Sequence, residues 1–441
     1  MSGRNIGRKP VNALKKPAVL VLIFIFILTG CNSARESGGI EESENAAASV
    51  TVRDTEKDSV KKTTESEQTS EGTQSETETP HQETSPETTE PVTTTGEARP
   101  ETEMTTGQTE PSVPHTDPPV QQTEPPAEPP VQDQPQMNGT PFGSHGRLSV
   151  SGTRLTDQYG AGYTLRGIST HGLSWFPEYV NYDMFKQMRD EWNVNVVRLA
   201  MYTAEYNGYC TGDMYNREKL KKLIDDGVNY ANQLGIYVII DWHILSDGNP
   251  NMYKNESIEF FREISAKYAG YGNVIYEICN EPNGGTGWGE IKSYAQDVIN
   301  VIRSNDSSGI VIVGTPTWSQ DADIAADDRL NGENIMYAMH FYADTHRDHI
   351  RDKLVNAINK GLPVIVSEFG ICDASGNGGI NYDEASKWMS LLNQYSVSYV
   401  LWNLSNKSET SAMIQSWCGK SAGFSYEELS ESGKWFVNLN K

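Results

Sequence analysis

The chain has 441 residues, with 59 acidic and 36 basic side chains and a formal net charge of −23. Residues 138–441 alone hold 36 acids and 25 bases, a net charge of −11. Because binding to phosphates needs clustered Lys and Arg, this charge argues against nucleic acid as a partner and fits a neutral substrate better.

The first 31 residues have the pattern of an export signal. Five basic residues between positions 4 and 16 precede an apolar run at 18–28, and the run closes on Leu28-Thr29-Gly30-Cys31. The run is 11 residues long, whereas a helix that spans a bilayer needs about 20. The segment resembles a bacterial lipoprotein signal, which implies that residues 1–30 are removed and that Cys31 is acylated. The alternative is simple secretion, with Cys31 incidental.

The composition of residues 31–137 predicts a disordered linker. From 32 to 137 there is no Phe, Tyr or Trp, and 23 acids stand against 6 bases. A segment of low hydrophobicity and like charge cannot build a core. A flexible chain of about 106 residues would reach roughly 55 to 60 Å. We therefore expect a lipid-anchored tether that presents the remaining domain on the extracellular face of a bacterial cell membrane.

Residues 138–441 alternate between strand-like and helix-like segments. Starts of successive strands are 25 to 42 residues apart, which is the length of a strand, a helix and two loops. The pattern predicts an α/β fold, a (β/α)8 TIM barrel preceded by a short hairpin at 148–159. The expected strands are 163–169, 194–201, 236–244, 274–281, 310–316, 335–343, 362–370 and 399–405. The expected helices are 182–192, 217–234, 257–269, 290–303, 347–359 and 382–393.

A doubly wound sheet shares this alternation. Nearly every expected strand, however, ends in polar or aromatic residues, and a barrel brings all eight of those ends to one face, where barrel enzymes place their chemistry. This placement favours the barrel.

Two of the apolar runs end in a carboxylate. The run from Val274 reaches Glu281, and the run from Val364 reaches Glu368. Glycoside hydrolysis requires two such groups, one to protonate the leaving oxygen and one to attack or to activate water. Glu277 competes with Glu281, but four residues at about 3.3 Å would put it roughly 13 Å deeper in the barrel. We interpret Glu277 as a buried structural acid that pairs with an Arg.

Several motifs, taken in their order along the chain, indicate a family. They include Leu165-Arg166-Gly167-Ile168-Ser169-Thr170-His171-Gly172-Leu173, Asn280-Glu281-Pro282-Asn283, His340-Phe341-Tyr342, Ser367-Glu368-Phe369-Gly370 and Trp402-Asn403-Leu404-Ser405-Asn406-Lys407-Ser408-Glu409. From about residue 145 to 441 the chain resembles the bacterial endoglucanase branch of glycoside hydrolase family 5. The resemblance implies retaining hydrolysis of β-1,4-glucan, with Glu281 as acid/base and Glu368 as nucleophile.

The same resemblance implies supporting roles for strand-end residues. Asn280 is expected to bond the sugar 2-hydroxyl, Tyr342 to contact the nucleophile, and Arg198, His243 and His340 to hold the carboxylates. These side chains could also be satisfied polar groups of the core.

A further set of residues is expected to contact glucosyl units. Aromatic faces stack on sugar rings, although such residues can equally be core or loop anchors. The set comprises His171, Trp175, Phe176, Tyr202, His243, Trp318, Tyr342, Ala374, Ser375, Trp402, Lys407, Ser408 and Glu409.

No metal or organic cofactor is implied, and a monomer is expected. The cysteines after Cys31 match no metal motif, packing is the default interpretation for Cys279, and a Cys210–Cys418 disulfide stays open. The rival functions are a mannanase, a xyloglucanase or a mixed-linkage glucanase on the same barrel. A surface carbohydrate-binding lipoprotein without activity is the rival from another class.

Overall fold

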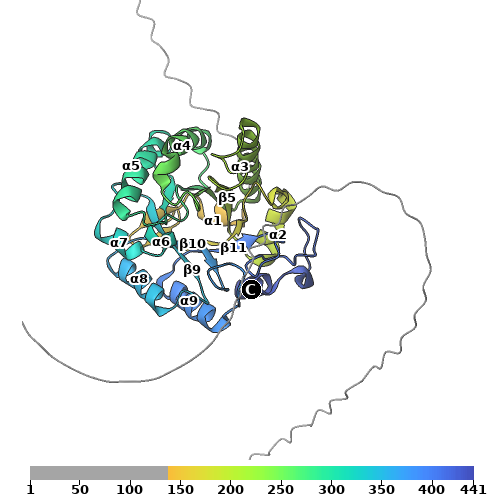
Figure 1. Cartoon of the computed structure of the whole chain (residues 1–441). Coiled ribbons are helices and arrows are strands. Elements are labelled where there is room, and N and C mark those ends of the chain that lie inside the picture. The colour runs from red at the N-terminus through yellow and green to blue at the C-terminus, as the bar shows by residue number, and fades with distance from the viewer. Residues whose placement is uncertain (1–137) are drawn as a thin grey trace, which may run out of the picture. The chain divides into compact units, whose positions relative to one another are not determined.

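The computed structural model describes residues 138–441 (Figure 1). The predicted signal, Cys31 and the linker lie outside the described residues, so the domain boundaries at 30 and 137 stay predictions. Within the described residues, no helix is both long and apolar enough to cross a membrane.

The predicted barrel is confirmed. Eight parallel strands close in the order β10-β11-β4-β5-β6-β7-β8-β9. The strands are β4 (Arg166–Thr170), β5 (Val196–Tyr202), β6 (Tyr237–His243), β7 (Val274–Glu277), β8 (Ile310–Val313), β9 (Ile335–Tyr342), β10 (Val364–Gly370) and β11 (Tyr399–Leu404).

Helices surround the barrel, as the view down its axis shows (Figure 1). They are α2 (Tyr182–Trp192), α3 (Met214–Leu234), α4 (Lys254–Tyr268), α5 (Trp288–Asn305), α6 (Pro316–Ser319), α7 (Ala322–Asp327), α8 (Asp348–Asn359), α9 (Tyr382–Tyr395) and α10 (Glu431–Leu439), with short 3-10 turns at Pro177–Tyr179, Pro250–Tyr253 and Tyr426–Glu428. The bounds of α2 match the prediction. Helix α3 begins three residues earlier than predicted, because Asp213 caps it by accepting from Asn216 N at 2.8 Å.

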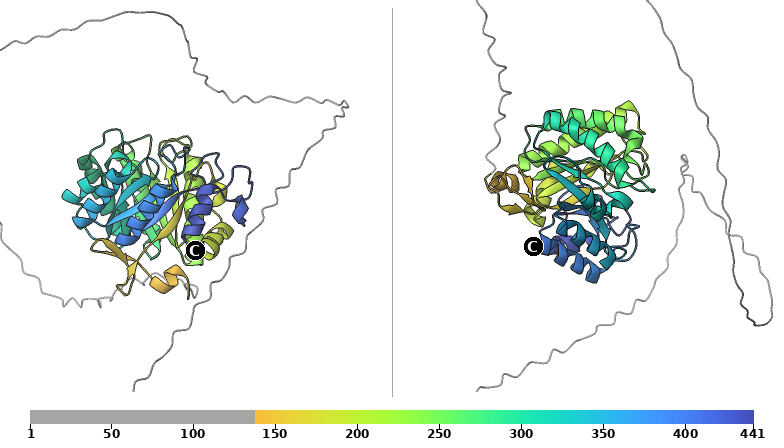
Figure 2. Two further views of the ribbon diagram at one scale, coloured as in Figure 1. Left: turned by 90° about the horizontal axis from the view of Figure 1, so that it is seen from below. Right: turned by 90° about the vertical axis from the view of Figure 1, so that its left-hand side faces the viewer.

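The N-terminal elements form a small layer at one end of the barrel (Figure 2). They are α1 (Pro141–His145) and an antiparallel sheet of β1 (Ser149–Ser151), β2 (Arg154–Thr156) and β3 (Gly162–Tyr163). The predicted hairpin is therefore present, and Tyr163 extends it as β3 instead of starting the first barrel strand. The Tyr237 hydroxyl, at the start of β6, donates to the Gly146 carbonyl at 2.7 Å. The layer thus covers the amino ends of the strands and leaves the carboxyl ends free.

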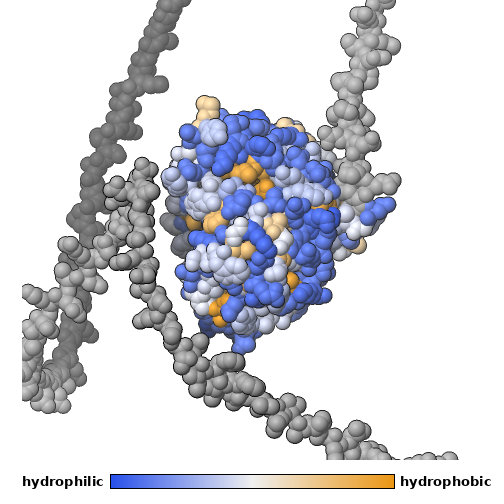
Figure 3. All heavy atoms as spheres, turned by 90° about the vertical axis from the view of Figure 1, so that its right-hand side faces the viewer, coloured by the Kyte–Doolittle hydropathy of each residue, from blue (hydrophilic) through white to orange (hydrophobic). Residues whose placement is uncertain are grey.

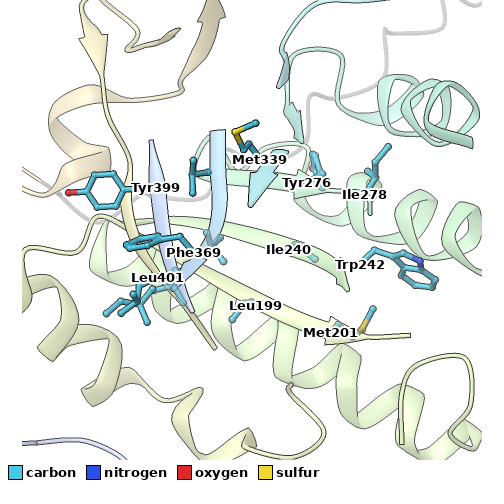
Figure 4. Packing of buried hydrophobic residues seen from close by; sticks show 14 of the residues in the cluster. Leu199, Met201, Ile240, Trp242, Tyr276, Ile278, Met339, Phe369, Tyr399 and Leu401 are labelled. Carbon is cyan, nitrogen blue, oxygen red and sulfur yellow. The ribbon is translucent and has the colours of Figure 1, made fainter. Parts of the chain in front are cut away.

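Alternating side chains divide each barrel strand between two cores. On β5 and β6 the outward residues, such as Leu199, Met201, Ile240 and Trp242, pack under the helices (Figure 4). The inward residues Val196 and Ile239 belong to a separate apolar cluster at the amino end of the barrel. Further along the same strands the inward positions are polar, so the barrel interior changes from apolar to ionic toward its carboxyl end.

The face drawn in Figure 3 is mostly hydrophilic, with scattered hydrophobic residues. The four cysteines of the described residues are free thiols, so the Cys210–Cys418 disulfide is not formed. Cys279 is buried, as expected, but it lies two residues beyond β7.

Candidate active site

A cavity of about 680 Å³ opens at the carboxyl ends of the strands. It is lined by both predicted carboxylates, Glu281 and Glu368, together with His340, Tyr342 and Trp402. The convergence that the barrel predicted is therefore observed.

Glu368 enters the cavity through an irregularity in β10. Ile365 pairs with Ala338 of β9, but the next pair is Glu368 with His340, so β10 has one extra residue. Such a bulge changes the alternation of side chains, and here Ser367 and Glu368 both reach groups inside the barrel. Glu368 Oε2 lies 3.2 Å from Arg198 Nη1, and Glu368 Oε1 accepts from the Tyr342 hydroxyl at 2.9 Å.

Glu281 lies on a loop and not on a strand. Strand β7 ends at Glu277, four residues before the predicted end. The loop is fixed by Asn280 N, which donates to the Trp242 carbonyl at 3.2 Å, and by the Pro282 carbonyl, which accepts from Trp318 N at 2.9 Å. Glu281 Oε1 lies 2.9 Å from His340 Nδ1.

Arg198 lies beneath the cavity and connects the acidic side chains there. Its guanidinium is fully buried and contacts three carboxylates, Glu277 at 2.7 Å, Asp241 at 3.0 Å and Glu368 at 3.2 Å. Burial alone would lower the pKa of Arg198, but the three carboxylates outweigh it and raise that pKa. The predicted pairing of Glu277 with an Arg is thus observed. Strand β7 ends at Glu277 and does not continue to Glu281, so the expectation that both residues lie on one strand, roughly 13 Å apart, is wrong.

Asn280 and His243 form a second chain of contacts. His243 Nδ1 lies 2.6 Å from Asp241 Oδ2, and Asn280 Nδ2 lies 3.3 Å from His243 Nε2. Asn280 Oδ1 accepts from Arg198 at 2.6 Å. A carboxylate partner at Nδ1 requires the His243 proton on Nδ1, so Nε2 accepts from the Asn280 amide. Asn280 is buried below the cavity and does not line it.

Burial sets the proton affinity of the carboxyl pair. It raises the pKa of Glu281 to about 8, with Arg198 opposing the shift and Asp241 and Glu277 adding to it. Burial also raises the pKa of Glu368, and the nearby Glu281 raises it further, while His340, Arg198 and His243 oppose the shift. Of the two, Glu368 holds the direct contact with Arg198, so it is the carboxyl better stabilised in its charged form.

Glu281, His340 and Glu368 also form a tight group of donor atoms. One atom from each residue lies within 4.8 Å of the others, a spacing that could hold a metal ion. Both ring nitrogens of His340 already contact other side chains, Glu281 Oε1 and Ser367 Oγ, each at 2.9 Å. Hydrogen bonding accounts for this arrangement.

Aromatic rings cover the side of the cavity formed by β11, β4, β5 and β6. Trp402 stacks on His243 with ring centroids 5.1 Å apart, and its ring is also 5.1 Å from that of His171. The Trp402–Asn403 peptide is cis. Trp175 stacks on Tyr202 at 4.8 Å, and Phe176 lies 4.9 Å from His171. Trp175 and Phe176, both partly exposed, are not among the residues that line the cavity.

The loop after β11 brings an ion pair to the same side. Lys407 Nζ lies 2.7 Å from Glu409 Oε2 and 3.3 Å from His171 Nε2. Burial, and then the charge of Lys407, lower the pKa of His171 to about 3. Ala374 and Ser375 also line the cavity, from the loop after β10, whereas Ser408 does not.

Trp318 borders the opposite side on a strained turn. Thr317, Trp318 and Ser319 all have φ between 54° and 58°, a left-handed conformation that costs non-glycine residues roughly 1 to 2 kcal/mol each. The turn is held by Ser319 Oγ, which donates to the Asn280 carbonyl at 2.6 Å. The Trp318 side chain is 46% exposed. Strain of this kind persists where the surrounding contacts over-determine it, commonly at binding sites.

The sequence interpretation missed some of the site. Leu245, Thr317, Gln320, His346 and Gly376 also line the cavity. Asp241 and Ser367 lie beneath it and contact the residues that do. Ser367 directly precedes Glu368, and Asp241 is two residues before His243, so closeness in sequence to a candidate residue was the available signal.

Comparisons with known proteins agree with this geometry. Residues 156–408 match the family model described as cellulase (glycosyl hydrolase family 5). The chain is 50% identical over 295 residues to endoglucanase A of Butyrivibrio fibrisolvens, and 49% identical over 295 residues to an endoglucanase of Clostridium saccharobutylicum. Each alignment covers 67% of this chain, and the relatives are covered over 68% and 64% of their own lengths.

A solved structure is similar over the same part of the chain. The catalytic domain of a Thermobifida fusca endoglucanase, determined in complex with cellotetraose, superimposes with a TM-score of 0.64 at 36% identity. The match covers 68% of this chain and 99% of that domain.

Proposed function

Because the chain belongs to glycosyl hydrolase family 5, we propose that it is an endoglucanase that cleaves internal β-1,4-glucosidic bonds with retention of configuration. In the first step Glu368 bonds to the anomeric carbon, the glycosidic bond from that carbon to the leaving oxygen breaks, and Glu281 gives its proton to that oxygen. In the second step Glu281 takes a proton from water, the water oxygen bonds to the anomeric carbon, and the bond to Glu368 breaks.

The observation that carries the proposal is the pairing of two differently supported carboxyl groups in one cavity. An oxygen of Glu281 and one of Glu368 lie within 4.8 Å of each other. Retaining enzymes place the two groups about 5 to 5.5 Å apart, whereas inverting enzymes need about 6.5 to 9.5 Å to admit a water. The short separation therefore supports retention.

The partners of each group support the assigned roles. Arg198 and Tyr342 contact Glu368, which favours the charged nucleophile. Burial keeps the pKa of Glu281 near 8, so this group holds a proton at neutral pH and can act as the acid.

The distribution of aromatic side chains suggests how a glucan chain lies. The sugar that Glu368 attacks would rest against Trp402, with the preceding units toward His171, Tyr202 and the pair of Lys407 and Glu409. The leaving part would lie on the side of Glu281 and Trp318. Two findings support a β-glucan substrate: the similar proteins are endoglucanases, and the similar Thermobifida fusca domain binds cellotetraose.

The test is reducing-sugar release by the purified protein from carboxymethyl cellulose, mannan, xyloglucan and lichenan in parallel. We expect the highest rate on carboxymethyl cellulose, a rapid fall in viscosity, and the β-anomer as the first product in proton NMR. A preference for mannan, xyloglucan or lichenan would reassign the substrate, and an α-anomeric first product would overturn the mechanism.

We also propose that acylated Cys31 holds the enzyme on the outer face of the cell membrane. The proposal is supported by the signal-like sequence before Cys31 alone. A Cys31→Ser variant should appear in the medium or stay uncleaved in the membrane. Mass spectrometry of the wild type should find a lipid on the mature terminus, and a lipid-free terminus would refute the anchor.

A further inference from the structure

A buried chain of hydrogen bonds runs from Glu277 to Glu281. Ser367 Oγ lies 2.6 Å from Glu277 Oε1 and 2.9 Å from His340 Nε2, and His340 Nδ1 lies 2.9 Å from Glu281 Oε1. All four residues are buried, and the side chains of Glu277 and Ser367 are completely inaccessible to solvent. The bulge in β10 makes the chain possible, because it lets Ser367 point into the barrel beside Glu368.

The donor and the acceptor of each hydrogen bond follow from the bond between Ser367 and Glu277. Glu277 forms an ion pair with Arg198 at 2.7 Å, and an ionised carboxylate can only accept hydrogen bonds. The single proton of the Ser367 hydroxyl therefore points to Glu277. The Ser367 oxygen is left to accept, so His340 Nε2 must carry a proton and donate to it.

The last bond is then also directed. A neutral imidazole has one N–H, and burial keeps His340 neutral by lowering its pKa to about 4. With the proton on Nε2, the Nδ1 atom that faces Glu281 is an acceptor. Glu281 Oε1 can bond to it only by donating, which requires the protonated carboxylic acid.

We propose that Glu277 and Ser367 are positioning residues that set the His340 tautomer and thereby keep the catalytic proton on Glu281. This inference rests on the proposed function. Neither residue touches the substrate. When Glu281 has given its proton to the leaving oxygen, its carboxylate faces the lone pair of His340 Nδ1 and no donor. This arrangement makes the carboxylate a stronger base for the proton of the incoming water in the second step.

Other charged groups also face this chain. Arg198 from β5 and Asp241 from β6 lie beside Glu277, while Glu368 from β10 lies beside His340 and Glu281. Glu277 Oε1 also lies 4.0 Å from His340 Nε2. A Ser367 variant alters none of these charged groups and removes only the hydroxyl that bonds to both Glu277 and His340.

The experiment compares Ser367→Ala with Ser367→Thr, which restores the hydroxyl, in the full-length protein. The substrates are phenyl β-cellobioside, whose poor leaving group needs an acid, and 2,4-dinitrophenyl β-cellobioside, whose good leaving group does not. In Ser367→Ala the His340 proton is free to move to Nδ1 and donate to ionised Glu281. We expect the alkaline limb of the pH profile of kcat/KM to move down by about one pH unit. The rate on the phenyl substrate should fall at least about tenfold more than the rate on the dinitrophenyl substrate.

The control variant Ser367→Thr and one further variant complete the test. Ser367→Thr should keep the alkaline limb of the wild-type pH profile and the wild-type ratio of the rates on the two substrates. Glu277→Gln removes the carboxylate that orients Ser367, so it should move the limb in the same direction as Ser367→Ala.

The outcomes separate the two proposals. Suppose that the wild type cleaves both substrates, and that Ser367→Ala loses activity equally on both and keeps the alkaline limb of the wild type. This result would leave the proposed function intact and overturn the positioning role. Absence of cleavage by the wild type on either cellobioside and on carboxymethyl cellulose would overturn the proposed function, and the inference with it.

Discussion

The two halves of the cavity rim are built differently. The aromatic half, at the ends of β11, β4, β5 and β6, presents Trp402, His171, Tyr202 and His243, whose rings contact one another in stacked, tilted and edge-to-face pairs. The acidic half, at the ends of β7, β8, β9 and β10, presents Glu281, Glu368 and the hydrogen-bond partners of both, His340 and Tyr342. Stacked rings make a surface for sugar, whereas proton transfer needs donors and acceptors whose direction is fixed.

The largest effect is expected when a carboxyl group of the acidic half is replaced. Glu281→Gln and Glu368→Gln should fold normally and lose activity by about 10² to 10⁴-fold or more, because each takes away one half of a two-carboxylate mechanism. A variant that kept more than about a tenth of the wild-type rate would contradict its assignment. Azide should rescue Glu368→Gly by giving an inverted glycosyl azide, which identifies Glu368 as the nucleophile.

Trp402→Ala tests the aromatic half. It deletes the ring on which the attacked sugar is expected to rest, and truncating a central aromatic contact costs about 2 kcal/mol, a factor of about 30. We expect kcat/KM to fall by this factor on cellotetraose and on an aryl cellobioside alike, because both substrates place a sugar there. A loss confined to cellotetraose would place Trp402 on the leaving side instead.

Trp318→Ala tests the opposite border, with a smaller expected effect. The half-exposed ring can bind only the leaving part of the chain, so kcat/KM on cellotetraose should fall about fivefold, the equivalent of about 1 kcal/mol. Activity on the aryl cellobioside, which has no leaving sugar, serves as the internal control. An equal loss on both substrates would show that the left-handed turn supports Glu281 and that the ring does not bind sugar.

The last prediction concerns stability and pH and does not depend on activity. Burial raises the folded-state pKa of Glu281 from its ordinary 4.5 to about 8, so the stability linked to its proton is fully present below about pH 4.5 and is lost as pH rises to about 8. Glu281→Gln does not titrate. Its melting temperature relative to the wild type should therefore increase between pH 5 and 8 and level off above. The exposed Glu333→Gln is the matched control for the loss of a carboxyl group, and a flat difference for Glu281→Gln would contradict the buried acid.

The sequence alone determined the architecture and the chemical pair. Apolar runs separated by amphipathic helices predicted eight βα units, and a barrel brings the ends of all eight strands to one face. That local pattern was sufficient to place Glu281 and Glu368 together. It separated Glu277 from Glu281 on the wrong ground, a strand that continues to Glu281, although the expected pairing of Glu277 with an Arg is observed. Motif resemblance added most of the residues that line the cavity.

Tertiary structure alone decided how these residues meet. The bulge in β10 depends on the register of the neighbouring β9, so no pattern within β10 could reveal that Ser367 and Glu368 both point inward. The early end of β7 and the left-handed turn at Trp318 depend on contacts between the loops after β7 and β8. Hydrogen-bond direction is likewise a property of the assembled network, because a histidine tautomer is set by partners on other strands. The sequence could therefore name Glu281 and His340, but only the fold could show which of them holds the proton.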